Sequence, residues 1–191
     1  MAESIIKLTS EKIKPESDEL RIIKATRVDP KVFGELYLLY VEPIFRYLYS
    51  RIGNVHEAED MTAQTFLAAF ESFERFREDG HFASWLFTIA RNKAMDHFRK
   101  RENISSIEEI DDIPLDNDPL SGVIQSEQTA SLSKLIQALP EDERELLRLR
   151  FLAEMSFPEM AHFLHNNEEA VKKSVYRLLA RLHSQLEVSN E

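Results

Sequence analysis

Apolar side chains recur at every third or fourth position through most of this chain, and this spacing constrains the fold more than any other feature. The spacing is typical of amphipathic helices, and no segment shows the two-residue alternation of β-strands. Helical patterns fill two blocks, residues 29–101 and 128–186. Residues 102–126 between them are acidic and contain Pro114, Pro119 and Gly122, which is typical of a linker. The sequence therefore predicts an all-α protein with two small helical domains.

Three helices are predicted in the first block, after a polar tail over residues 1–17 that we expect to be flexible. Asp29-Pro30 is a typical helix start, and Gly53-Asn54 is a typical break. The helices are expected near 30–52, with a kink at Pro43, near 55–76 and near 82–101. Their predicted inward residues are Phe33, Leu36, Tyr37, Tyr40, Ile44 and Leu48, then Phe66, Ala69, Phe70 and Phe73, then Phe82, Leu86, Ile89 and Ala90.

The second block ends in the pattern of a helix-turn-helix. A helix near 132–139 and another over 141–153 come first. Ser156 and Glu159 then form a capping box, and Asn167 is a good N-cap for a last helix to about Leu186. Basic and polar side chains share the outer face of that helix, which is the face a recognition helix turns to duplex DNA. An ordinary helical hairpin with a solvated face is the alternative.

Charge is unevenly distributed along the chain. The formal net charge of −10 disfavours a nucleic-acid binder, because phosphate contacts need Lys and Arg. Residues 102–127, however, carry eight acidic side chains and no basic one, whereas residues 91–101 and 171–183 each carry a net charge of +4. Both basic stretches end helical blocks, where cations also complement the helix dipole. The first is interleaved with aromatic residues, a composition typical of single-strand binding.

Several function classes have little support. The chain has no Cys, no P-loop and no Gly-rich turn, and its His residues lack partners at metal-ligand spacing. We therefore expect no catalytic residues, no metal and no cofactor. No apolar run is long enough for a membrane helix, and the first residues lack the apolar core of a signal peptide, so membrane insertion is not expected.

Three separated motifs together resemble the extracytoplasmic-function (ECF) sigma factors of bacterial RNA polymerase. They are GNVHEAEDMTAQTFLAAFESF, FREDGHFASWLFTIARNKAMDHFRKR and LPEDERELLRLRFLAEMSFPEMAHFLHNNEEAVKKSVYRLLARL. The resemblance implies a sigma region 2 bundle over residues 18–101, a flexible acidic linker over 102–126 and a region 4 helix-turn-helix over 127–187. It also implies a cytoplasmic bacterial protein that directs core polymerase to promoters and assists their melting.

The resemblance assigns roles to residues at matching positions. Core-polymerase binding, through both large subunits, would use Glu57, Glu59, Asp60, Gln64 and Glu71. The single-stranded minus-ten element would be bound by Arg77, Gly80, His81, Phe82, Trp85, Arg91, Asn92, Lys93, Asp96 and Arg99. The duplex minus-thirty-five element would be bound by Lys172, Lys173, Ser174, Tyr176, Arg177 and Arg181.

Some positions depart from the family pattern. Ala63 stands where Gln is common, His165 where Gly is common in the turn, and Ser174 where Arg is common. An anti-sigma factor is a further partner that the family commonly uses. The acidic linker would repel free DNA, so weak promoter binding without polymerase is expected. The alternative function is a stand-alone helix-turn-helix regulator that binds duplex DNA as a dimer.

Overall fold

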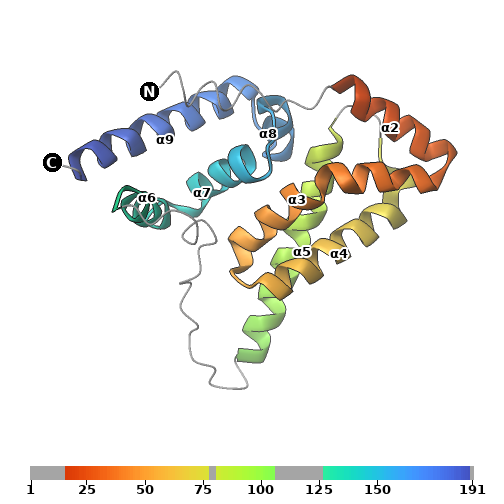
Figure 1. Ribbon diagram of the computed structural model, residues 1–191, viewed down its shortest axis with the longest axis horizontal. Coiled ribbons are helices and arrows are strands. Elements are labelled where there is room, and N and C mark those ends of the chain that lie inside the picture. Colours follow the sequence, from red (N-terminus) through yellow and green to blue (C-terminus); the bar gives the residue numbers. More distant parts are fainter. Residues whose placement is uncertain (1–15, 78–80, 106–126, 190–191) are drawn as a thin grey trace.

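The computed structural model describes residues 16–77, 81–105 and 127–189, and these are helical with short connections, which confirms the all-α prediction. The N-terminal bundle comprises four α-helices and two 3₁₀ turns: α2 (Glu16–Val28), η1 (Pro30–Val32), α3 (Phe33–Ile52), α4 (Val55–Ser72), η2 (Phe73–Arg75) and α5 (Phe82–Ser105). The C-terminal unit comprises α6 (Glu127–Gln137), α7 (Glu141–Leu147), the π-helical turn η3 (Arg148–Leu152), α8 (Phe157–Phe163) and α9 (Glu168–Ser189). Figure 1 shows the two groups of helices.

Local signals set the boundaries of the bundle helices. The side chain of Asp29 accepts a hydrogen bond from the Lys31 amide at the start of η1, and α3 then continues through the buried Pro43. Gly53 ends α3 with φ 75°, a left-handed conformation that glycine adopts without a Cβ clash. Asn54 caps α4 by accepting from the Glu57 amide. The sharp turn places α4 against α3, and α5 packs on both.

Aromatic rings fill the bundle core. Phe82 is 1% exposed, and its ring meets Tyr40 edge-on at a centroid distance of 5.4 Å and Phe76 at 5.4 Å. Edge-to-face pairs of this kind add to the stabilisation from burial. Two predicted inward residues lie at the margin instead, since Tyr37 is 42% exposed and Phe70 is 47% exposed.

The sequence did not predict helix α2, and several predicted helix bounds differ in the structure. The helix expected to reach Phe76 ends at Ser72 and continues as a short 3₁₀ turn. The helix expected to reach Ala153 ends at Leu147, where η3 widens the turn and the Ala153 amide bonds the Arg148 carbonyl. A π-helical turn replaces i→i+4 bonds by i→i+5 bonds over a single turn and is rare, so the apolar spacing over 141–153 gave no reason to expect one.

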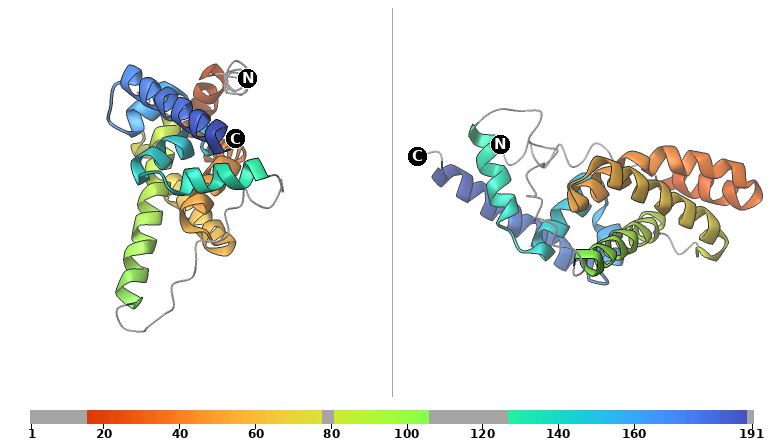
Figure 2. Two further views of the ribbon diagram at one scale, coloured as in Figure 1. Left: turned by 90° about the vertical axis from the view of Figure 1, so that its left-hand side faces the viewer. Right: turned by 90° about the horizontal axis from the view of Figure 1, so that it is seen from below.

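The two groups of helices are docked on each other through a contact that we call the interdomain seam: residues 141–163 of the C-terminal unit against α3 and α5. Helix α8 lies on α5, and η3 lies on α3 (Figures 1 and 2). Leu149, Met155 and Met160 are at most 1% exposed and belong to the same apolar core as the bundle. Two small domains joined by a linker were predicted, and the sequence did not predict this shared core.

A buried carboxylate anchors the seam. Glu145 is 8% exposed and accepts hydrogen bonds from the Tyr47 hydroxyl at 2.7 Å and from the Arg51 guanidinium at 2.8 Å. Arg148 of its own unit lies 3.4 Å away. A buried charge left unpaired costs several kcal/mol, so these partners fix where α7 sits.

No helix in the described parts of the chain combines the length and apolarity that crossing a bilayer requires. The tail over residues 1–15 and the central part of the predicted linker, residues 106–126, lie outside the described residues.

Alkaline pH should weaken the fold through Tyr47. Burial, followed by the neighbouring Glu145 charge, raises the pKa of Tyr47 well above its ordinary value of 10.0. Above pH 10 the unfolded chain loses this proton while the folded chain keeps it, so the free energy of unfolding should fall by about 1.4 kcal/mol per pH unit from this group. Urea unfolding between pH 10 and about pH 11.5 should show a shallower slope for Tyr47→Phe than for the unaltered chain. Equal slopes would contradict the buried, protonated hydroxyl.

Candidate nucleic-acid interface

Helices α8 and α9 form the predicted helix-turn-helix. Ser156 caps α8 in a capping box in which the Glu159 carboxylate accepts from the Ser156 amide at 2.6 Å. Asn167 accepts from the Glu169 amide at 2.8 Å and so starts α9. Val171 and Val175 face inward at 2% and 1% exposure. The predicted recognition residues are all exposed along the opposite face of α9: Lys172, Lys173, Ser174, Tyr176, Arg177 and Arg181.

The turn between α8 and α9 contains a non-glycine residue in a disfavoured backbone conformation. His165 has φ 50°, in the left-handed region where a side chain costs about 1–2 kcal/mol. This explains why glycine suits the position, and the His165 backbone amide still bonds the His162 carbonyl at 3.2 Å.

An aromatic-cation cluster supports the start of the α9 face. The Phe157 ring lies 5.8 Å from the Tyr176 ring, with the Arg150 guanidinium 4.8 Å and the Lys172 ammonium 6.0 Å from its centroid. Burial lowers the pKa of Arg150, and its side chain donates to the Met155 carbonyl at 2.6 Å. Sequence reasoning placed Phe157 in the apolar face of its helix and did not assign Arg150, because their pairing depends on the η3 turn. Phe157 thus contacts both Tyr176 and Lys172 of the α9 face, and Arg150 packs on Phe157.

The outer face of α5 carries the second candidate surface. Asn92, Met95, Asp96 and Arg99 line a shallow depression of about 370 Å³, in which Asp96 and Arg99 are paired at 2.9 Å. An amide, a carboxylate and a guanidinium there can exchange hydrogen bonds with base edges, and the thioether gives an apolar contact.

The remaining predicted minus-ten residues differ in exposure. Arg77 and Arg91 are exposed, and Lys93, Trp85 and His81 are half-buried. Phe82 lies in the core, where it can support neighbouring side chains but offers no surface of its own. Gly80 lies outside the described residues.

The third candidate surface is the outer face of α4. Asp60, Gln64 and Glu71 are exposed along it, as the 3.6-residue period predicts. Glu57 points instead toward α5, where its carboxylate lies 3.3 Å from His97 Nε2. Glu57 therefore lies between α4 and α5, a placement that the sequence pattern did not reveal.

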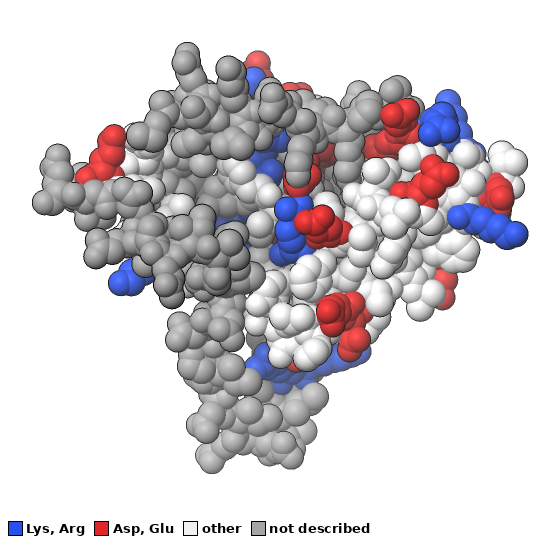
Figure 3. Space-filling model, in the orientation of Figure 1, with Lys and Arg blue, Asp and Glu red and all other residues white. Residues whose placement is uncertain are grey.

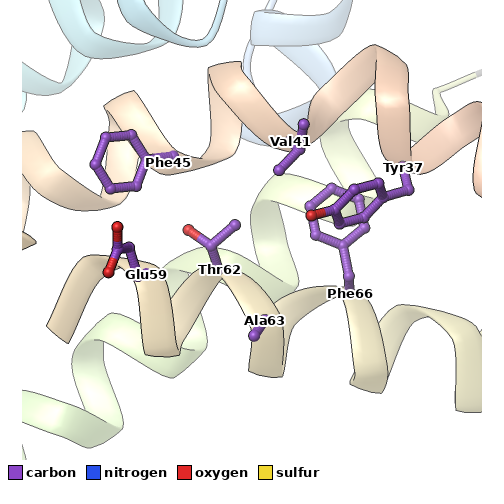
Figure 4. A pocket seen from close by; sticks show the side chains of 7 residues that line it. All are labelled: Tyr37, Val41, Phe45, Glu59, Thr62, Ala63 and Phe66. Carbon is purple, nitrogen blue, oxygen red and sulfur yellow. The ribbon is translucent and has the colours of Figure 1, made fainter. Parts of the chain in front are cut away.

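An apolar groove of about 410 Å³ adjoins the α4 face. It is lined by Tyr37, Val41 and Phe45 of α3 and by Glu59, Thr62, Ala63 and Phe66 of α4. Glu59 and Thr62 point toward α3, and the Tyr37 and Phe66 rings lie 4.8 Å apart (Figure 4). In Figure 3 the bundle side of the molecule shows uncharged surface with separate acidic and basic groups. The α3 side of the groove was missed, because Tyr37 fits the inward stripe of its helix. The groove extends the predicted acidic face with apolar contact area.

No group of three or more His, Cys, Asp or Glu side chains that could hold a metal ion occurs among residues 16–77, 81–105 and 127–189.

Comparison with known proteins identifies the family. Residues 36–104 match sigma-70 region 2, and residues 129–182 match sigma-70, region 4. The chain is 34% identical over 175 residues to the ECF RNA polymerase sigma factor BldN of Streptomyces coelicolor, a match that covers 87% of this chain and 66% of that relative. The chain belongs to the ECF sigma factors of the sigma-70 family. It is also 27% identical over 177 residues to SigW of Bacillus subtilis, covering 87% of this chain and 95% of SigW.

ECF sigma factors act in transcription initiation, bind core RNA polymerase and are not enzymes. Two solved structures share the fold of this one at a TM-score of 0.60 each. CnrH, solved with the cytosolic domain of CnrY, is 22% identical and covers 88% of this chain and 97% of its own. RpoE from Bartonella quintana, solved with the anti-sigma factor NepR, is 23% identical and covers 83% of this chain and 98% of its own.

The strained turn of the helix-turn-helix predicts a stabilising substitution. His165→Gly removes the Cβ that disfavours φ 50°, and this gain exceeds the extra chain entropy of glycine, so stability should rise by about 0.5–1 kcal/mol. Urea unfolding measures the difference. The neighbouring Asn166→Gly, at a position without positive φ, is the control and should not stabilise. A loss of stability in His165→Gly equal to that of the control would contradict the strain.

Proposed function

We propose that this sigma factor uses the three surfaces described above for three different contacts: with core polymerase, with the minus-ten element and with the minus-thirty-five element. Residues 18–101 form the unit that binds polymerase and the minus-ten element, residues 102–126 are the linker, and residues 127–187 bind the minus-thirty-five element. The observation that carries the proposal is the exposure of six candidate contact residues on one face of α9, a face that contains no acidic side chain between 171 and 183.

Polymerase binding is assigned to the outer face of α4. Asp60, Gln64 and Glu71 give it an acidic and polar character, and Glu59 reaches the rim of the apolar groove. An acidic rim around an apolar groove suits a helical partner with basic flanks and an apolar stripe. Core polymerase, with contacts to both large subunits, is the proposed partner, and the bacterial cytoplasm is the proposed place of action.

Promoter contacts are assigned to α5 and α9. The α5 face would hold the unpaired minus-ten strand against Asn92, Asp96 and Trp85, with Arg77 and Arg91 near the backbone. The α9 face would enter the major groove of the minus-thirty-five duplex, where Arg177 can read a base edge and Lys172 can reach phosphate. Because unstacking a base step costs a few kcal/mol, opening draws on the contacts of the whole holoenzyme.

An anti-sigma factor is proposed as a further partner. CnrH and RpoE, which share the fold, were solved in complex with the cytosolic domain of CnrY and with NepR. The groove between α3 and α4 is a surface that such a partner could occupy in place of polymerase.

A pull-down with bacterial core RNA polymerase, followed by run-off transcription, tests the function directly. The chain should be retained by core polymerase and should confer transcription from promoters that core polymerase alone does not use. Dimeric binding of a palindromic duplex without polymerase would instead favour the stand-alone regulator.

Arg177→Ala should weaken minus-thirty-five recognition if this guanidinium reads a base. A lost bidentate base contact costs about 1–3 kcal/mol and relaxes the preference at that position. Holoenzyme binding to promoter variants, selected from a random library, measures both effects. Ser184→Ala, exposed on the same helix beyond the predicted contact residues, is the matched control. An unchanged promoter preference in Arg177→Ala would remove this residue from base reading.

A further inference from the structure

The groove between α3 and α4 is the centre of a longer apolar strip on the N-terminal bundle. Leu38 of α3 is 75% exposed, and Leu67 and Phe70 of α4 are 59% and 47% exposed. Helical period places Leu38 on the same face of α3 as Val41, which lines the groove. Leu67 and Phe70 lie one and two turns after Ala63, on the groove face of α4. A contiguous exposed apolar surface of this kind marks an interaction site.

The charge around this strip is of one sign. Residues 33–45 of α3 and residues 55–72 of α4 contain no Lys and no Arg. Their acidic side chains are Glu35, Glu42, Glu57, Glu59, Asp60 and Glu71. All of these except Glu57 are exposed. An apolar strip with an acidic border favours an occupant that combines aliphatic side chains with cations.

The chain itself contains a segment of this composition. Residues 5–14, with the sequence IIKLTSEKIK, carry four aliphatic side chains, three lysines and one glutamate. The aliphatic residues Ile5, Ile6 and Leu8 surround Lys7, and Ile13 stands between two further lysines. This segment therefore complements the strip both in its apolar content and in its charge.

Helix α2 brings this segment to the groove. The Tyr40 hydroxyl donates a hydrogen bond to the Glu19 carboxylate, which places the first turns of α2 beside the middle of α3. Helices α2 and α3 run in opposite directions, so Glu16, where α2 begins, lies toward the end of α3 that carries Phe45 (Figure 1). Val41, the residue after Tyr40, already lines the groove, so the first turn of α2 and the groove occupy neighbouring faces of α3.

The chain before Glu16 is long enough to reach along the groove. Leu8 is eight residues from Glu16, and eight extended residues span up to about 26–29 Å. A helix with its side chains is about 10–12 Å across, and the eight positions from Tyr37 to Phe45 extend about 12 Å along α3. A short connection also gives the segment an effective concentration of about 1 mM at the groove.

We propose that residues 5–14 bind the groove between α3 and α4 in the free chain and compete there with core polymerase. The aliphatic side chains lie on the apolar strip, and the lysines lie beside its acidic border. The competition rests on the proposed function, whereas the binding of the segment does not. With an intrinsic Kd of about 0.1–1 mM, the segment weakens the apparent affinity for core polymerase about two- to tenfold.

A spin label on the segment tests the binding in the full free chain. The chain has no Cys, so a nitroxide on Ser4→Cys is the only label. It should broaden the amide resonances of Val41, Phe45 and Ala63 several-fold more than that of Arg177, which lies on the outer face of α9. A mixture of labelled chain with isotope-enriched, unlabelled chain should show no such broadening.

Two pairs of variants provide matched comparisons. Ile5→Asn with Ile6→Asn removes aliphatic contacts without a change of charge and should abolish the selective broadening, whereas Thr9→Asn with Ser10→Asn should keep it. Ala63→Lys places a cation inside the groove and should also abolish it. Gln64→Lys, at the next and exposed position of α4, makes a similar charge change outside the groove lining and should not.

Titration of bacterial core RNA polymerase tests the competition in the full chain. The variant with Ile5→Asn and Ile6→Asn should bind core polymerase about two- to tenfold more tightly than the unaltered chain. The variant with Thr9→Asn and Ser10→Asn should bind it with unaltered affinity.

Uniform or absent broadening in the free chain would overturn the binding of the segment. Equal broadening in the mixed sample would make a second copy the occupant and would overturn the intramolecular contact. Equal polymerase affinity of the isoleucine variant and the unaltered chain would overturn the competition. If the unaltered chain fails to bind polymerase in the pull-down, the proposed function fails, while the measurement on the free chain still decides the binding of the segment.

Discussion

The position of the C-terminal helices against the N-terminal bundle depends on the hydrogen bonds and ion pairs of the buried Glu145 carboxylate. It lies buried between the Tyr47 hydroxyl and the Arg51 guanidinium of α3, with Arg148 beside it on its own unit. A charge in such a place is stable only with its partners present. The Glu145 site fixes where α7 meets α3, and the apolar contacts of η3 and α8 with the bundle follow from that position. These contacts place α8 on α5.

Most of the helical structure could be predicted from the sequence, because its signals are local. The left-handed Gly53, the Asn54 cap and the Ser156–Glu159 capping box act within a few residues of each other, and the structure has all of them where the pattern indicates. The outer face of α9 and most of the outer face of α4 also follow from helical period, since residues on one face of α9 remain on one face once its inward valines are known.

The interdomain seam could not be predicted from the sequence, because it joins residues that are far apart in the chain. Their residue types do not indicate which partners they contact. Glu145 stands in an acidic helix that resembles a solvated surface, and it meets residues about 100 positions earlier. Ser84 is a small polar residue in a helix start, and only α8 makes it a buried one. Tyr37 and Phe70 show the converse error, because they were expected in the core and are partly exposed. Helical period alone does not distinguish the centre of a core from its margin.

The structure shows where the basic side chains lie in a protein whose net charge is −10. The basic stretches at the ends of the two helical blocks belong to α5 and α9, where the proposed promoter contacts lie, and docking of the C-terminal unit covers one of those surfaces in part. Cross-linking tests this account most directly. In a chain with His81→Cys and His162→Cys, a short bis-maleimide should join the two positions rapidly, because their native rings are 4.6 Å apart. Cross-linking that is as slow as in a urea-unfolded sample would contradict the account.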